Sequence, residues 1–241
     1  MDDCTKTAET AEATLAALRA RIDAMDRQLA DLFNARIGII AEVAALKAAH
    51  WPNTCHIRPG REGQMHRATC DRFAHGPFPA LAALAIWRQL IGASTHLESS
   101  LAVTALAAYP EHLWLAREYF GVQVGLTASA TLATALETLA TRRSNILILP
   151  TPTASDWWQQ AEALRAAGLF IFAQLPVVAD NLPAGATAAV ALATVTPEPS
   201  GDDISYHLRA GELVTRDGFH PDDDGIFLGA HPRAIHLGAS A

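Results

Sequence analysis

The sequence predicts a multi-domain chain of α plus α/β class, in which a helical domain, residues 1–101, precedes a small α/β domain, residues 102–241. Three observations support this fold class. Residues 15–50 contain no Pro and a single Gly, and their apolar residues recur at helical spacing. Two shorter helical segments follow before residue 100. Beyond that residue, short apolar runs alternate with helical segments, a pattern typical of α/β domains.

The first expected element is a helix that continues to about Ala49, roughly 50 Å long at a rise of about 1.5 Å per residue. Its apolar residues follow alternating steps of three and four, as in a coiled coil. These seam residues are Leu15, Leu18, Ile22, Met25, Leu29, Leu32, Ile39, Val43 and Leu46. The seam is too long for one small domain to cover, so it predicts a partner helix from a second subunit. Arg36 stands at a seam position where an apolar residue is expected, and residues 1–10 are expected to form a frayed or loosely helical leader.

Breaker residues separate this helix from two shorter ones. Trp51-Pro52-Asn53 ends the long helix, because the residue before a Pro is disfavoured in helical conformation. A second helix is expected over residues 61–73, after Pro59-Gly60, and a third over residues 80–98. The helical half is therefore expected to contain one long and two shorter helices.

Beyond Ser100 the expected elements alternate between strand and helix. Strands are predicted at 101–107, 121–126, 145–149, 169–175 and 187–195, and helices at 111–120, 129–141 and 155–167. Ser129 and Ser155 are the expected N-caps of two of these helices. We therefore expect a sheet with some parallel pairing, and short strands joined by turns from Thr196 onward.

Composition excludes several classes of function. The formal net charge of −7 argues against nucleic acid or an anionic membrane as the main partner. The N-terminal ten residues do not form a signal peptide, and no apolar run is long enough to span a membrane. Cys4, Cys55 and Cys70 show no CxxC spacing, so neither a disulfide framework nor a metal site is indicated. We expect a cytoplasmic protein without a metal.

The charged residues of the long helix suggest a site for an anion. Arg36 and Lys47 lie only about 20° apart around the helix axis, whereas Arg19 lies roughly 100° from Arg36. Arg19 is therefore better placed to reach a partner subunit's site than its own. Taken alone, Arg19 and Lys47 are compatible with a solvated surface. Arg36 is different, because an unpaired guanidinium buried in the seam costs several kcal/mol, and an anion is the natural compensation.

At this point the sequence resembles the all-helical class of chorismate mutases. The resemblance covers residues 15–98 and depends on the combined spacing of several short motifs. These are Leu18-Arg19-x-x-Ile22-Asp23-x-x-Asp26, Arg36, Val43-x-x-x-Lys47 and Arg61-Glu62. The resemblance implies an intertwined helical homodimer that converts chorismate to prephenate and needs no cofactor.

The same resemblance implies a role for each matching residue. Arg36 would hold one substrate carboxylate, and Arg19 of the other subunit would hold the second. Lys47 would contact a carboxylate and the ether oxygen, and Glu62 would accept a hydrogen bond from the ring hydroxyl. The residues that would act on the reacting atoms or the substrate charge are Lys47, Glu98 and Arg36. Arg61 and Ser94 would line the pocket.

Glu98 corresponds to the family's Gln or Glu that hydrogen-bonds the ether oxygen. A Claisen rearrangement involves no nucleophile and no proton transfer, so the protein must hold the dianion compact and stabilise charge on the breaking bond. An ionised Glu98 would repel that oxygen, so the residue must be protonated to donate. We therefore expect activity to fall as pH rises through neutrality. Arg58, in the loop before the second helix, is expected to be solvated.

The second half resembles the periplasmic-binding-like fold of prephenate dehydratases, through its βα pattern and the segment 145–150. Dehydratases carry a Thr-Arg-Phe motif late in this domain, and the nearest stretch, residues 201–206, lacks it. This half is therefore expected to be a degenerate, non-catalytic domain.

Two alternatives to a mutase remain open. One is an isochorismate pyruvate lyase, which would use nearly the same carboxylate contacts. The other is a non-catalytic regulator that binds a chorismate-like metabolite. The segment Pro59-Gly60-Arg61-Glu62 favours the mutase, but a product assay is needed to decide.

Overall fold

The computed structural model describes residues 2–51 and 56–237, with side chains described from residue 10 onward. The chain divides into two compact units, Met1–Pro52 and Asn53–Ala241, and we describe each by itself. The boundary near residue 101, expected from the change in sequence pattern after Ser100, stays a prediction. In terms of compactness, the second and third helices belong with the sheet.

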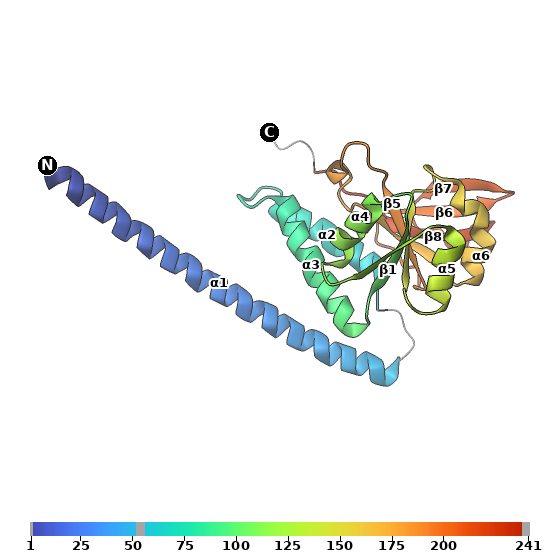
Figure 1. Cartoon of the computed structure of the whole chain (residues 1–241), viewed down its shortest axis with the longest axis horizontal. Coiled ribbons are helices and arrows are strands. Elements are labelled where there is room, and N and C mark those ends of the chain that lie inside the picture. The colour runs from blue at the N-terminus through green and yellow to red at the C-terminus, as the bar shows by residue number, and fades with distance from the viewer. Residues whose placement is uncertain (1, 52–55, 238–241) are drawn as a thin grey trace. The chain divides into compact units, whose positions relative to one another are not determined.

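The first unit is a single continuous helix, α1 (Asp2–His50), drawn in blue in Figure 1. It is longer at its start than the sequence predicts, because the expected leader continues the same helix. Eight of the nine seam residues are between 46% and 64% exposed in the isolated chain, and the ninth, Val43, is partly buried. A helix with so many apolar side chains in contact with water is typical of one that pairs with another helix.

Helices α2 (Pro59–Phe73) and α3 (Ala80–Glu98) confirm the two shorter helices of the sequence analysis. Pro59 starts α2 because its fixed φ suits the first turn and its missing N–H has no helical partner there. Two glycines allow close packing on the rest of the unit. A side chain at Gly92 would collide with the backbone carbonyl of Phe120, and one at Gly63 would collide with Pro232.

The rest of the unit is a mixed eight-stranded sheet with helices on both faces. Its strands are β1 (Ala102–Leu106), β2 (Gly125–Ser129), β3 (Ile146–Pro150), β4 (Phe170–Leu175), β5 (Ala189–Ala193), β6 (Asp203–Arg209), β7 (Glu212–Asp217) and β8 (Ile226–Pro232). The order across the sheet is β2-β1-β3-β5-β4-β8-β6-β7. β1 runs parallel to β2 and β3, and β4 runs parallel to β8. β5 is antiparallel to β3 and β4, and β6 is antiparallel to β7 and β8. The expected partial parallel pairing is confirmed.

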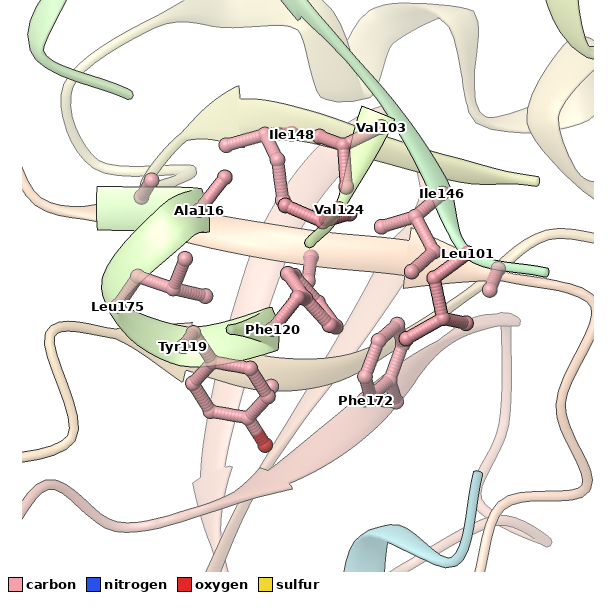
Figure 2. Close-up of a cluster of buried hydrophobic side chains, with 14 of the residues drawn as sticks. Leu101, Val103, Ala116, Tyr119, Phe120, Val124, Ile146, Ile148, Phe172 and Leu175 are labelled. Carbon is pink, nitrogen blue, oxygen red and sulfur yellow. The ribbon is translucent and has the colours of Figure 1, made fainter. Parts of the chain in front are cut away.

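Side-chain alternation along the strands builds a core on each face of the sheet. Ile146 and Ile148 of β3 point to the face covered by α4 (Glu111–Phe120), where Phe120 meets Phe172 edge-on (Figure 2). Leu147 and Leu149 point to the other face. That face is covered by α5 (Leu132–Ala140), by η1 (Asp156–Gln160), a 3₁₀ helix, and by α6 (Ala161–Ala166). The short 3₁₀ turn η2 (Ala179–Asn181) follows β4.

Some local predictions are wrong. The strand expected at 121–126 begins at Gly125 and extends to Ser129, so Ser129 is not an N-cap. Its hydroxyl instead pairs with that of Thr104 on β1, and Thr131 caps α5 through a capping box. The helix expected at 155–167 is divided into η1 and α6, and Ser155 makes no side-chain cap.

Candidate functional site

The predicted site residues are divided between the two compact units. Arg19, Arg36 and Lys47 belong to α1 in the first unit. The other predicted residues, Arg61, Glu62, Ser94 and Glu98, belong to α2 and α3 in the second. Each group is described within its own unit.

On α1, the side-chain exposure separates Arg19 from the other two cations. Arg19 is exposed, whereas Arg36 and Lys47 are partly buried. This difference agrees with the helical phase expected from the sequence, in which Arg36 and Lys47 share a face. The assignment of Arg19 to a partner subunit's site stays a prediction.

On α2 and α3, Glu62 and Ser94 are buried, Glu98 is partly buried, and Arg61 is exposed. Ser94 donates a hydrogen bond of 2.7 Å to the carbonyl of Leu90, one turn earlier in the same helix. The side chains of Glu62 and Ser94 are therefore enclosed by protein, whereas those of Arg61 and Glu98 keep some contact with solvent.

The Glu62 carboxylate is held by a cluster of polar groups buried between α2, α3 and α4. Arg88 of α3 donates from Nη1 to Glu62 Oε2 at 2.7 Å, and the two side chains are only 4% and 9% exposed. The Tyr119 hydroxyl of α4 donates to the same oxygen at 3.3 Å. Arg88 also donates from Nε and Nη2 to the backbone carbonyl of Tyr119, the former at 2.8 Å.

His66 completes this cluster as a neutral acceptor. Its Nε2 lies 3.0 Å from Arg88 Nη1, and since a guanidinium can only donate, Nε2 must carry the lone pair. Burial, assisted by the charges of Arg88 and Arg67, holds the pKa of His66 well below its ordinary value. Burial and the nearby Glu62 carboxylate raise the pKa of Tyr119, so its hydroxyl stays protonated and able to donate.

Sequence reasoning missed Arg88, although a signal for it exists. Leu84, Arg88, Ile91 and Thr95 recur at helical spacing and all face the interior. An arginine in such an apolar stripe is the same irregularity that draws attention to Arg36 on the long helix. A buried arginine at an apolar position predicts a buried anion beside it, and in the structure this anion is Glu62.

Glu98 also has a neighbour that the sequence analysis did not consider. His56 Nδ1 lies 3.3 Å from Glu98 Oε2, and the two side chains are 12% and 9% exposed. His56 precedes α2, so the segment that enters this helix places an imidazole beside Glu98.

Arg58 is exposed, as expected, and it also forms an ion pair. Its guanidinium donates to both carboxylate oxygens of Glu198 at 2.9–3.1 Å, although its side chain is 59% exposed. The hydrogen bonds and charge of Glu198 raise the pKa of Arg58. Glu198 also accepts from the backbone N–H of Arg61 at 3.5 Å, so an acidic residue of the α/β half lies at the N-terminus of α2, where the helix dipole favours it.

Other features of the second unit lie apart from the predicted site residues. A hollow of about 550 Å³ lies beside the end of α2 and the turn into α3, and Cys70, Phe73, Phe78, Asp180 and His236 border it. Over residues 2–51 and 56–237, no three His, Cys, Asp or Glu residues gather in a group suited to a metal ion. Within the same described ranges, no helix has the length and apolarity needed to cross a membrane.

Comparison with known protein families gives one match, in the helical part of the chain. Residues 18–99 match the family model of chorismate mutase type II. The matched span includes all seven predicted site residues and also Arg88.

The remaining comparisons are distant. A solved structure titled "GqqA- a novel type of quorum quenching acylases" aligns with 55% of this chain and 95% of its own, at 12% sequence identity and a TM-score of 0.38. That degree of similarity supports no inference about fold or function. No curated protein matches the sequence.

Proposed function

We propose that this chain is a chorismate mutase, an isomerase of aromatic amino-acid synthesis that acts in the cytoplasm. The match of residues 18–99 to chorismate mutase type II carries this proposal. It is supported by the presence, within that span, of a basic or polar residue at each position that the family pattern requires.

The reaction would be an electrostatically assisted Claisen rearrangement. Arg36 and the partner's Arg19 would bind the two carboxylates of chorismate and hold it in the compact shape that reacts. Lys47 would donate to a carboxylate and the ether oxygen, with Glu98 as the second donor to that oxygen, and Glu62 would accept from the ring hydroxyl. Arg61 and Ser94 would border the substrate. Because no proton is transferred, positioning and charge stabilisation would supply the rate enhancement.

The proposed site requires a homodimer. The exposed apolar seam of α1 supports this requirement, because eight large apolar side chains remain 46–64% exposed in the isolated chain. A second copy of α1 would bury them at roughly 25 cal/mol per Å² of apolar surface. In that arrangement Arg19 of one subunit would complete the site of the other.

The α/β half would be a non-catalytic domain related to prephenate dehydratases. Its lack of a Thr-Arg-Phe motif supports a role other than dehydration. Its contacts with α2 and α3 through Glu198 and Tyr119 support a role in holding these two helices in place.

A product assay with the full-length chain tests the proposed function. Purified protein would be mixed with chorismate, and separately with isochorismate, while prephenate and pyruvate are quantified. A mutase forms prephenate from chorismate, and a lyase releases pyruvate from isochorismate. A non-catalytic regulator consumes neither substrate but binds one of them in calorimetry. Absence of prephenate with the pure, folded protein would contradict the proposed function.

A further inference from the structure

The cluster around Glu62 joins the mutase helices to the α/β half through side chains that are almost completely buried. Glu62 lies on α2, Arg88 on α3 and Tyr119 on α4. The Tyr119 ring packs in the apolar core of the α/β half, and Figure 2 shows its hydroxyl pointing away from the labelled core side chains. That hydroxyl donates to Glu62 Oε2, so the core of one half fixes the position of a charged group in the other.

Arg88 is itself immobilised by contacts on several sides. Its guanidinium donates to Glu62 and to the Tyr119 backbone carbonyl, and it lies over the Tyr119 ring at 3.7 Å from the ring centroid. A guanidinium held in this way has a fixed orientation, and it transfers that orientation to the carboxylate it binds.

We propose that Arg88 and Tyr119 are positioning residues for the Glu62 carboxylate in the mutase reaction, so that helix α4 of the α/β half sets the geometry of substrate binding. Among the described residues, both polar partners of Glu62 contact Oε2, which leaves Oε1 to accept from the substrate's ring hydroxyl. This inference rests on the proposed function, because it assigns that contact to Glu62.

The chemistry of the substrate predicts which kinetic constant changes. The ring hydroxyl takes no part in the bonds that break and form, so Glu62 binds it equally in the ground state and the transition state. Weakening such a contact raises KM and leaves kcat nearly unchanged. A general structural defect would instead lower kcat or the amount of active protein.

Tyr119→Phe is the sharpest variant, because it removes one hydroxyl and keeps the ring against Arg88 and His66. We expect KM for chorismate to rise about three- to tenfold, the loss typical of one hydrogen bond, with kcat within about twofold of the unmodified protein. Tyr206→Phe is the matched control, since it removes a buried hydroxyl that contacts His231 on β8, and its kinetics should not change.

A double-mutant cycle shows whether Tyr119 acts through Glu62. In a Glu62→Gln background, Tyr119→Phe should have little further effect, because the carboxylate that it positions is gone. Arg88→Lys, which keeps the charge but loses the fork geometry, should raise KM in the same way. Melting curves show whether each variant folds. If Tyr119→Phe or Arg88→Lys fails to fold, the other of these two variants provides the test.

The outcomes separate the two proposals. If the unmodified protein forms no prephenate, the proposed function and this inference both fail. If it is active and Tyr119→Phe has the same KM as Tyr206→Phe, or if the effects of Tyr119→Phe and Glu62→Gln are additive, the positioning role alone is wrong.

Discussion

At the residue scale, Arg36 and Arg88 occupy the same kind of position, because each stands in a helix where the spacing calls for an apolar side chain. For Arg88 the compensating anion is Glu62, which lies 2.7 Å away in the same unit. For Arg36 the proposed function assigns a carboxylate of the substrate as an anionic partner. Replacing an arginine that binds a ligand is expected to lower turnover. Replacing an arginine that binds a protein carboxylate is expected to change the geometry around that carboxylate.

Replacing Arg36 by Ala tests this distinction. We expect Arg36→Ala to abolish turnover and to leave the dimer intact or more stable, because it removes a charge from an apolar seam. Mixing inactive Arg36→Ala chains with inactive Arg19→Ala chains should restore activity, since each hybrid dimer then contains one complete site. Random pairing would restore about one quarter of the sites.

Sedimentation and prephenate assays on the same samples provide the measurement. Arg21→Ala, which removes another exposed cation of α1, is the control and should retain activity. A folded mixture that stays inactive would show that Arg19 does not act across the dimer, and unfolding of Arg36→Ala would assign Arg36 a structural role.

The second prediction at this scale concerns Glu98. Its side chain is the proposed second donor to the ether oxygen, and the amide of Gln is a donor of the same shape. We therefore expect Glu98→Gln to keep turnover and Glu98→Ala to lower kcat about tenfold or more, because the ether oxygen then loses a donor as charge develops on it. Glu137→Ala, on the exposed side of α5, is the control and should keep full activity. Initial rates of prephenate formation provide the measurement, and an unchanged kcat in folded Glu98→Ala would disprove this role.

At the element scale, α3 packs closely on α4 because Gly92 has no side chain. The ideal Cβ position at Gly92 lies too close to the Phe120 carbonyl for any side chain to fit without a shift of the backbone. The close approach of the two helices is also what places Arg88 against the Tyr119 carbonyl. The packing of these two helices therefore supports the proposed positioning of Glu62.

Gly92→Ala is expected to lower the free energy of unfolding by about 1–3 kcal/mol, the usual cost of overpacking. Because the helices would separate slightly, KM for chorismate should rise as well. Urea unfolding and initial rates provide the two measurements. Gly38→Ala on α1 is a matched control, since nothing lies within 4 Å of its added Cβ and Ala favours helix. Equal stability of Gly92→Ala and the unmodified protein would show that α3 and α4 can separate without cost.

At the scale of the whole molecule, short-range sequence patterns predicted most of the helices and strands, but they did not predict how these pack together. Helix α3 has the expected bounds, because Pro79 and the apolar spacing act over a few residues. The order of the strands depends on pairing between distant segments, which no local signal encodes. The Glu62 cluster was missed for the same reason, since Arg88 and Tyr119 lie 26 and 57 residues further along the chain.

The packing of α2 and α3 against the sheet could not be predicted from the sequence either. The sequence changes texture near residue 101, yet α2 and α3 form one compact unit with the sheet. Their union depends on small residues at points of close approach, such as Gly63 against Pro232, and on ion pairs such as Arg58 with Glu198. A glycine or a loop arginine gives no sign in the sequence of which distant segment it contacts.

The sheet and helices α2 and α3 should therefore lose stability together in acid. Burial lowers the pKa of His231, which lies on β8 beside Tyr206 of β6, to about 4, and it holds the pKa of His66 well below its ordinary value. An unfolded histidine titrates near pH 6.5, so between about pH 6.5 and 4 the unfolded chain binds protons that the folded chain does not. The stability from neutral His231 is thus complete above about pH 6.5 and is lost as pH falls toward 4.

For His231 alone the loss amounts to about 3 kcal/mol in the free energy of unfolding. Urea titrations at several values between about pH 7.5 and 4 measure it, and His231→Gln should reduce the acid-dependent loss, because Gln does not titrate. His75→Gln, in the exposed turn between α2 and α3, is the control and should keep the full pH dependence. If His231→Gln loses as much stability in acid as the unmodified protein, His231 is not neutral in the fold, and the hydrogen bond that its Nε2 accepts from Tyr206 must be assigned differently.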